Sequence, residues 1–193
     1  MKIDIILAGV GGQGILSIAS TIGFAAVNTG LFLKQAEVHG MSQRGGDVQS
    51  NLRLSSNDIA SDLIPKGKAD LIISVEPMEA LRYLPMLKKD GWVITNTTPF
   101  INIPNYGGVD NVLAEINKLP RKIAIDADTI ARELGSPRSA NMVILGAAAP
   151  FLDMDYKSLE DAITTMFSRK GQEVVDINIA CLKAGRDFAE ANK

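Results

Sequence analysis

Apolar residues along the chain fall into short runs that alternate with stretches of helical spacing. The short runs predict β-strands at residues 3–7, 31–38, 48–54, 71–75, 92–96 and 123–126. The helical spacing predicts helices at residues 15–26, 77–87, 109–119, 128–134, 140–149, 159–167 and 174–188. Strands that alternate with helices build a mostly parallel sheet covered on both faces. We therefore predict a three-layer, Rossmann-like α/β fold, with a single domain over residues 1–193.

Individual residues predict where some helices begin and end. Pro77 is tolerated in a first turn, and Gly91 is expected to end the helix that Pro77 begins. Asp128 is the expected N-cap of a helix that stops at Gly135. Residues 158–161 (SLED) resemble a capping box at the start of the next helix.

Composition and charge exclude several classes of protein. Apolar residues make up 46% of the chain, charged residues make up 22%, and the formal net charge is −2. This balance is typical of a globular protein and indicates neither a nucleic-acid partner nor a membrane partner. The N-terminus becomes polar too early for a signal peptide, and no apolar run approaches the ~20 residues that span a bilayer. We therefore expect a cytoplasmic protein.

The chain has one cysteine, Cys181, and one histidine, His39. An intrachain disulfide is therefore impossible, and an iron–sulfur cluster held by this chain is excluded because it needs about four thiolates. Cys181 lies on an apolar helix stripe, which predicts core packing rather than reactivity. His39 has no evident nucleophile beside it, so we expect it to fix a loop or an interface. Asp126 and Asp128 are better explained as a cap and a turn residue than as metal ligands.

A glycine-rich turn follows the first predicted strand. Gly9, Gly11 and Gly14 match the pattern G-x-G-x-x-G between a strand and a helix. Such glycines let the backbone approach a phosphate, and the following helix N-terminus favours negative charge. The same spacing also fits a tight strand-to-helix turn that binds no ligand, and both interpretations remain open.

A dinucleotide-binding fold is one alternative that this turn raises. It needs an acidic residue at the end of the second strand, about 20 residues on, and Glu37 meets that need. The chain should then continue into a helix. A polar loop with three glycines and a further strand follow instead, which lowers the weight of this alternative without removing it.

The loop at residues 39–46 is the second candidate anion-binding segment. Arg44 is flanked by polar and glycine residues and offers a planar, permanently charged group to a phosphate or carboxylate. Gly45 and Gly46 leave backbone N–H groups accessible. An ordinary surface loop is the competing interpretation. Both glycine-rich loops follow strands, so we expect them to meet at the carboxyl edge of the sheet, where open α/β sheets bind ligands.

No catalytic group is identifiable beside these two loops. The sequence has no serine–histidine–aspartate arrangement, no thiamine-binding motif and no P-loop. Arg138 or Asn141, ahead of an alanine-rich helix, could face a ligand, although capping is equally plausible. The chain therefore has the features of a binding subunit.

The motifs resemble those of a known family, the gamma-type domain of 2-oxoacid:ferredoxin oxidoreductases, and most of all the indolepyruvate oxidoreductase type. The resemblance covers nearly the whole chain. The segments that carry it are residues 9–15 (GVGGQGI), 37–46 (EVHGMSQRGG), 76–83 (EPMEALRY), 126–135 (DADTIARELG) and 141–146 (NMVILG), together with Asn178 and Gly185.

The resemblance implies a partner and a reaction. A large alpha subunit would carry thiamine diphosphate and [4Fe–4S] clusters, and this chain would carry neither. The complex would convert an aryl pyruvate to an aryl-acetyl-CoA and pass electrons to ferredoxin. By position, the resemblance assigns coenzyme A contacts and no catalytic residue to this chain, the contacts being Gly11, Gly12, Gln43, Arg44, Gly45, Asn96 and Asn141. Some relatives have two lysines at positions 43 and 44, so the charge there differs.

Three functions remain open from the sequence. The first is the small subunit of an aryl-pyruvate:ferredoxin oxidoreductase, inactive by itself. The second is a free-standing NAD(P)-binding oxidoreductase. The third is the equivalent subunit of an oxidoreductase for pyruvate or 2-oxoglutarate.

Overall fold

The computed structural model describes residues 1–39, 45–101 and 105–193. Within these residues a six-stranded sheet forms the centre of the molecule, with strand order β2-β3-β1-β4-β5-β6. The strands are β1 (Lys2–Val10), β2 (Phe32–His39), β3 (Asp47–Ser55), β4 (Ala69–Ser74), β5 (Leu87–Asn96) and β6 (Lys122–Ile125). Each predicted strand is present, with shifted ends.

Only one strand of this sheet runs against the others. β3 pairs antiparallel with both β1 and β2, whereas β1, β4, β5 and β6 pair in parallel. β2 and β3 are joined by a short connection, which permits only antiparallel pairing. The predicted mostly parallel sheet is therefore confirmed, and β2 ends at the same edge as β1 despite the strand between them.

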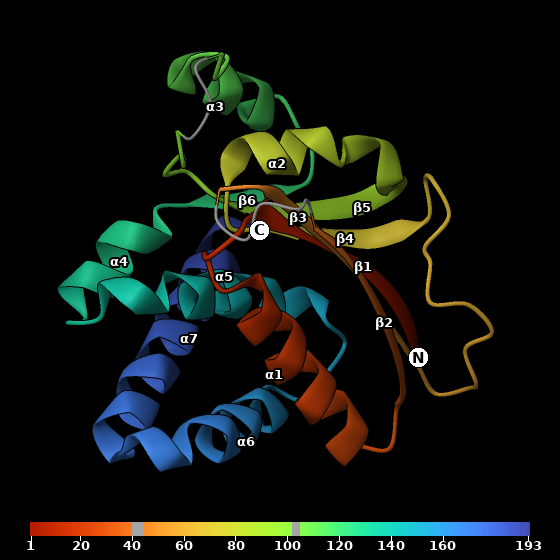
Figure 1. Ribbon diagram of the computed structural model, residues 1–193, viewed down its shortest axis with the longest axis vertical. Coiled ribbons are helices and arrows are strands. Elements are labelled where there is room, and N and C mark those ends of the chain that lie inside the picture. Colours follow the sequence, from red (N-terminus) through yellow and green to blue (C-terminus); the bar gives the residue numbers. More distant parts are fainter. Residues whose placement is uncertain (40–44, 102–104) are drawn as a thin grey trace.

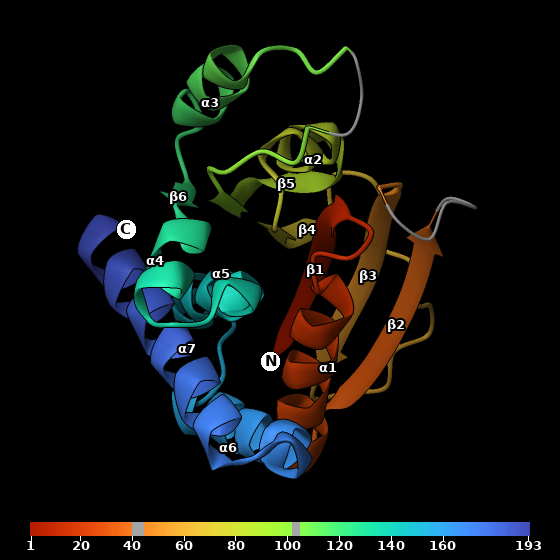
Figure 2. The ribbon, with the colours of Figure 1, turned by 60° about the vertical axis from the view of Figure 1, so that its left-hand side comes forward.

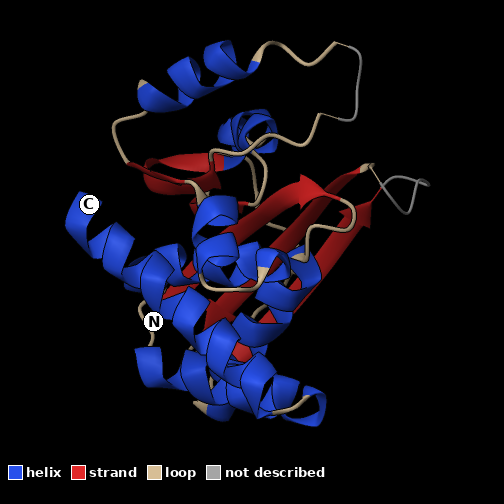
Figure 3. Ribbon diagram, turned by 90° about the vertical axis from the view of Figure 1, so that its left-hand side faces the viewer, coloured by secondary structure: helices blue, strands red, loops and turns tan. Residues whose placement is uncertain are grey.

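Helices cover both faces of the sheet (Figure 1). One face carries α2 (Pro77–Arg82) and α3 (Val109–Asn117). The other carries α1 (Ile15–Asn28) and α5 (Ala140–Ala148), with α6 (Tyr156–Phe167) and α7 (Gln172–Asn192) packed outside them. α4 (Ala127–Glu133) follows β6. Figure 3 shows the helices packed around the strands of the sheet. The three-layer prediction is confirmed.

The alternation of side chains along β1 explains why two cores form. Ile5 and Leu7 point into the larger core under α1 and α5, and Ile6 points into the smaller core under α2. All three side chains are fully buried. A strand buried on both faces reads as a continuous apolar run, as residues 5–7 do.

The crossing of α5 and α7 depends on two glycines. A Cβ added at Gly146 would lie 1.9 Å from the Leu182 carbonyl oxygen, and one at Gly185 would lie 1.9 Å from the Val143 carbonyl oxygen. Each glycine thus lets the opposite backbone approach closer than any side chain would allow. α5 is consequently enclosed between the sheet and α7.

Several predicted boundaries were wrong. α2 ends at Arg82, a 3₁₀ turn containing Pro85 follows, and Gly91 lies inside β5 rather than ending a helix. A Cβ at Gly91 would lie 2.9 Å from the Asp70 carbonyl oxygen, so this glycine serves the packing of two strands. The N-cap of α4 is Asp126, whose carboxylate accepts the Thr129 N–H, and not Asp128.

The predicted capping box at residues 158–161 was also wrong. α6 begins at Tyr156, and its N-cap is Asp155, which accepts the Lys157 N–H. Ser158 therefore lies inside the first turn. The serine hydroxyl donates back to the Asp155 carbonyl, an alternative that a serine near a helix start often takes.

No described helix is both long enough and apolar enough to cross a membrane.

Candidate functional site

The two glycine-rich loops meet at the carboxyl edge of the sheet, as predicted. The Gly11 N–H donates to the Gly46 carbonyl at 2.9 Å, and the Gly45 N–H donates to the Gly11 carbonyl at 3.5 Å. These bonds extend the β1–β3 pairing beyond Val10 and Asp47. The backbone of Gly11 is therefore committed to the protein, which leaves its N–H unable to serve a ligand.

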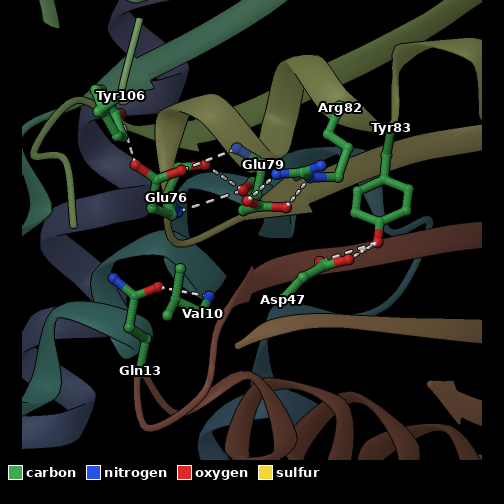
Figure 4. Close-up of polar contacts among 9 residues, drawn as sticks. Val10, Gln13, Asp47, Glu76, Glu79, Arg82, Tyr83 and Tyr106 are labelled. Carbon is green, nitrogen blue, oxygen red and sulfur yellow. Dashed lines mark hydrogen bonds and ion pairs between the residues drawn. The ribbon is translucent and has the colours of Figure 1, made fainter. Parts of the chain in front are cut away.

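The glycines of the first loop have different physical roles. A Cβ at Gly9 would lie 2.4 Å from Val75 Cγ2, so Gly9 is needed for packing. Gly12 and Gly14 adopt positive φ angles of 100° and 82°, which glycine tolerates without strain. Gln13 closes the turn, since its Oε1 accepts the Val10 N–H at 2.8 Å (Figure 4).

The first loop presents backbone donors at the start of α1. Within the described part of the chain, the N–H groups of Gly12 and Gly14 donate to no protein acceptor. The N–H groups of Ile15 and Leu16 have no backbone partner either, because the first donors of an α-helix lie ahead of its first acceptors, whereas the Ser17 N–H donates to the Gly14 carbonyl at 3.0 Å. No acidic residue lies in that first turn. This end of α1 consequently favours an anion.

A cleft of about 660 Å³ opens beside this helix end. α1, α4, α5 and α7 contribute to it, and all lie on the same side of the sheet (Figure 2). Its walls combine backbone, amide and cationic groups with an apolar surface, and the residues that matter most are Gly12, Ser17, Asn96, Arg138, Asn141 and Lys170. This size and mixture suit a nucleotide-sized ligand.

The structure brings three of the predicted site residues together in this cleft. Gly12, Asn96 and Asn141 all line it. The Asn141 Nδ2 donates to the Gly14 carbonyl at 3.2 Å and so joins α5 to the first loop. Asn96 is buried, and its Nδ2 donates to Asp128 Oδ2 at 2.6 Å while its Oδ1 accepts the Ala127 N–H at 3.1 Å. Asn96 therefore fixes the cleft wall.

The remaining predicted residues lie elsewhere. Gly11 is paired with the second loop, and Gly45 lines a smaller cleft of about 200 Å³ beside α2. Gln43 and Arg44 lie outside the described residues. Arg138, named from the sequence together with Asn141, does line the main cleft.

Sequence reasoning missed the wall formed by the corner between α6 and α7. Phe167 and Lys170 line the cleft there, and the Lys170 Nζ lies 5.1 Å from the centre of the Phe167 ring. Met166 contacts Thr21, which brings this corner alongside the second turn of α1. No local motif marks these residues, since only the packing of distant helices places them beside the first loop.

A partly buried network of carboxylates, one arginine and two tyrosines lies beside α2 (Figure 4). We define it as Asp47, Glu76, Glu79, Arg82, Tyr83 and Tyr106. Glu76 is almost fully buried and accepts three hydrogen bonds, from the Tyr106 hydroxyl at 2.7 Å, the Phe100 N–H at 3.3 Å and the Glu79 N–H at 2.9 Å. It therefore caps α2 and holds the segment after β5.

Burial sets the protonation behaviour of this network. It raises the pKa of Glu79 above its usual value, even though the neighbouring Arg82 acts to lower it. Burial raises the pKa of Tyr83, and its hydrogen bond to Asp47 raises it further. Burial and the hydrogen bond to Glu76 raise the pKa of Tyr106 in the same way. The tyrosines therefore stay protonated and act as donors. We assign the network a structural role, since the hydrogen bonds of Glu76 hold α2 and the segment after β5 in place.

The described lining of the main cleft offers no nucleophile with an adjacent general base, and contains neither cysteine nor histidine. Cys181 is buried in the core, and burial raises the pKa of its thiol to about 11. The predicted packing role of Cys181 is confirmed. The cleft can bind and orient a ligand but supplies no identifiable reacting group.

The sheet order also differs from that of a dinucleotide-binding fold. In such a fold the second strand lies in parallel directly beside the first, which places its terminal acid near the glycine-rich turn. Here β3 separates β2 from β1, so Glu37 is two strand spacings, roughly 10 Å, from β1. The arrangement disfavours the NAD(P) alternative.

Fold and cleft together define an α/β protein with a candidate ligand-binding cleft at the carboxyl edge of its sheet. Comparison with known proteins shows the family to which the chain belongs. The model of the pyruvate ferredoxin/flavodoxin oxidoreductase family matches residues 4–188, and the chain belongs to this family. The indolepyruvate oxidoreductase subunit IorB of Archaeoglobus fulgidus is 38% identical over 198 residues, covering 98% of this chain and 96% of that protein. The family resemblance of the motifs is confirmed.

Solved structures share the fold. The 2-oxoglutarate:ferredoxin oxidoreductase from Magnetococcus marinus, with coenzyme A bound, superposes with a TM-score of 0.79 at 22% identity. The match covers 100% of this chain and 32% of that one, so the fold there is part of a longer chain. The gamma subunit of the keto/oxoacid ferredoxin oxidoreductase from Geobacter sulfurreducens has a TM-score of 0.72 at 23% identity, covering 98% and 99% of the two chains.

Proposed function

We propose that this chain is the small subunit of an indolepyruvate (aryl pyruvate):ferredoxin oxidoreductase and that it contributes to coenzyme A binding. The complex oxidatively decarboxylates an aryl 2-oxoacid to an aryl-acetyl-CoA and reduces ferredoxin. Residues 1–193 act as one gamma-type domain in the cytoplasm. The 38% identity to IorB over nearly the full length of both chains supports this assignment.

The observation that carries the coenzyme A proposal is the main cleft. Gly12, Asn96 and Asn141 come from three separate parts of the chain and line one cavity at the start of α1. Unpaired N–H groups and a helix N-terminus there suit a pyrophosphate. The coenzyme A in the structural relative from Magnetococcus marinus is consistent with such a ligand.

Within this proposal the assigned residues have distinct tasks. Gly12 lets phosphate groups approach the backbone, and Asn141 holds the first loop against α5. Asn96 braces the wall, and Gly11 with Gly45 holds the two loops together. Gln43 and Arg44 complete the set, with Arg44 supplying a charged contact to phosphate. None of these residues reacts with the substrate.

The reacting groups then belong to a large alpha subunit that carries thiamine diphosphate and [4Fe–4S] clusters. α1 supports docking on such a partner because its 14 residues include no charged side chain. Its outer face leaves Leu16 52% and Val27 57% exposed, with Phe24 between them. An uncharged helix is normally buried on all sides, so we assign this face to the alpha subunit.

The test is co-expression with the large subunit, followed by a screen of 2-oxoacids with coenzyme A and ferredoxin supplied. We expect indolepyruvate and other aryl pyruvates to have the highest kcat/KM. A preference for pyruvate or 2-oxoglutarate would replace our assignment with the third function above. Tight NAD(P) binding by the isolated chain would support the second.

Arg44→Ala in the assembled complex tests the coenzyme A site. A lost charge-assisted contact of about 1.5–3 kcal/mol should raise the KM for coenzyme A about tenfold or more. The KM for the 2-oxoacid should stay unchanged, and the Gly11→Val, Gly12→Val double variant should act in the same direction. Impaired assembly with an unchanged coenzyme A dependence would make the second loop an interface element instead.

A further inference from the structure

The main cleft is cationic although the whole chain has a formal net charge of −2. Arg138 and Lys170 line it, and no described carboxylate forms an ion pair with either. The one carboxylate in the lining, Asp128, accepts a hydrogen bond from Asn96 at 2.6 Å. Two cationic side chains are thus available to an anionic ligand.

Arg138 lies at the end of the cleft near the first loop. It belongs to the 3₁₀ turn Pro137–Ser139, which runs directly into α5. Three residues later Asn141 bonds the Gly14 carbonyl at 3.2 Å, so the turn is held next to the N-terminus of α1. Arg138 can therefore act on the same phosphate groups as the unpaired N–H groups of Gly12 and Gly14.

Lys170 lies further along the cleft, in a different environment. The contact between Met166 and Thr21 sets the end of α6 beside the second turn of α1, away from the first loop. Phe167 is half-buried there, and Val174 and Ile177 continue the apolar wall. The cleft thus has a phosphate-binding end and an aromatic, apolar end with one positive charge.

These two ends match the two parts of an adenosine nucleotide that carries a second phosphate on its sugar. The first end suits the pyrophosphate, and the aromatic end with its positive charge suits the nucleoside and the second phosphate. We propose that Arg138 binds the pyrophosphate of coenzyme A, that Phe167 packs against its adenosine and that Lys170 binds its 3′-phosphate. This inference rests on the proposed coenzyme A binding and adds residues that select coenzyme A over its dephosphorylated form.

The experiment compares coenzyme A with dephospho-coenzyme A, which lacks only the 3′-phosphate, by calorimetric titration of the assembled complex. Lys170→Ala should weaken coenzyme A binding about tenfold or more and leave dephospho-coenzyme A binding unchanged. Arg138→Ala should weaken both ligands to the same degree. Lys170→Arg should restore most of the discrimination, which a general loss of structure would not allow.

Arg169→Ala is the matched control, since Arg169 is an exposed neighbour of Lys170 outside the cleft lining. It should bind both ligands like the unchanged protein. If Lys170→Ala keeps full discrimination while Arg138→Ala and the Gly11→Val, Gly12→Val double variant weaken coenzyme A binding, the assignment of the 3′-phosphate is overturned and the proposed function stands. If none of these variants changes coenzyme A binding, this chain does not hold the ligand and both proposals fail.

Discussion

Single residues in this chain take their behaviour from burial and from nearby backbone groups. Cys181 and Asp126 have pKa values shifted in opposite senses relative to their charged forms. Apolar side chains enclose Cys181 and disfavour its charged form, whereas Asp126 accepts hydrogen bonds that favour its charged form. Both effects lead to measurable expectations.

Cys181 should be inert in the folded chain. Its thiol has a pKa of about 11, so little reactive thiolate exists at pH 8, and the side chain is fully buried. Labelling with a thiol reagent should be slow in buffer and immediate in denaturant. A Ser20→Cys, Cys181→Ala variant provides an exposed thiol on α1 for comparison, and equal native labelling rates for the two thiols would refute the expectation.

Asp126→Ala should lower the free energy of unfolding by about 1 kcal/mol through loss of the α4 cap. Asp126→Asn should cost less, because asparagine also caps. Burial acts to raise the pKa of Asp126, but hydrogen bonds from Thr129 and Thr98 outweigh it and lower the pKa below its usual value. The stabilisation is therefore present at neutral pH and is lost as pH falls through the lowered pKa. Denaturant unfolding at pH 7 and at pH 2–3 should show the penalty shrinking in acid.

At the scale of elements, close backbone approach decides how the helices pack. Gly146 and Gly185 lie on facing sides of α5 and α7, and each occupies a place where no Cβ fits. The resemblance to the family included both positions, yet only the structure gives the reason. The packing of α7 in turn places Asn178 and the corner at Lys170 against the cleft.

Gly185→Ala or Gly146→Ala should destabilise the chain by about 3 kcal/mol, since the clash is with backbone that cannot rotate away. Gly107→Ala is the control, because its Cβ would meet nothing within 4 Å and its φ is not positive. Guanidinium unfolding of the three variants gives the comparison. If Gly185→Ala lowers the free energy of unfolding by less than about 0.5 kcal/mol, α7 can shift away from α5 and the close approach of the two helices is not required.

At the scale of the whole molecule, the proposed function makes the chain one part of a larger assembly. The described lining of its main cleft supplies no identifiable reacting group, and α1 presents an uncharged outer face. The cleft and the outer face of α1 both fit a subunit whose partner supplies the cofactors. They predict properties of the isolated chain and of its association.

The isolated chain should be colourless and redox-silent. One cysteine cannot hold an iron–sulfur cluster, which needs about four thiolates. Absorption spectra of the pure chain should lack a band near ~400 nm, whereas the complex with the large subunit should have it. A stoichiometric band in the monodisperse chain alone would contradict the assignment of the clusters to the partner.

Charges on the outer face of α1 should weaken association with the large subunit. Leu16→Glu and Val27→Lys place each charge at the helix end that favours it, so the helix should remain intact. We expect at least a tenfold higher Kd in native mass spectrometry, with unfolding changed by about 0.5 kcal/mol or less. Leu134→Lys, at the exposed C-cap of α4, is the control and should associate normally.

The sequence by itself determined the class of fold and the two loops. Apolar periodicity is a local property, so each strand and most helices could be predicted from it. Because each glycine-rich loop follows a strand, the sequence also predicted that the two loops would meet at the carboxyl edge of the sheet, and the backbone bonds of Gly11 to Gly45 and Gly46 confirm it. Helix ends were less predictable, because Asp126 and Asp128 have the same capping chemistry and only the geometry of the turn determines which of them is the N-cap.

The tertiary structure alone decided the sheet order and the composition of the cleft. Whether β3 inserts between β1 and β2 depends on long-range pairing, which no local pattern encodes, and that insertion separates Glu37 from the first loop. Phe167 and Lys170 reach the cleft only because α6 packs on α1 and α7 crosses α5 at two glycines. Local sequence therefore specified the elements, and the packing of distant surfaces specified the site.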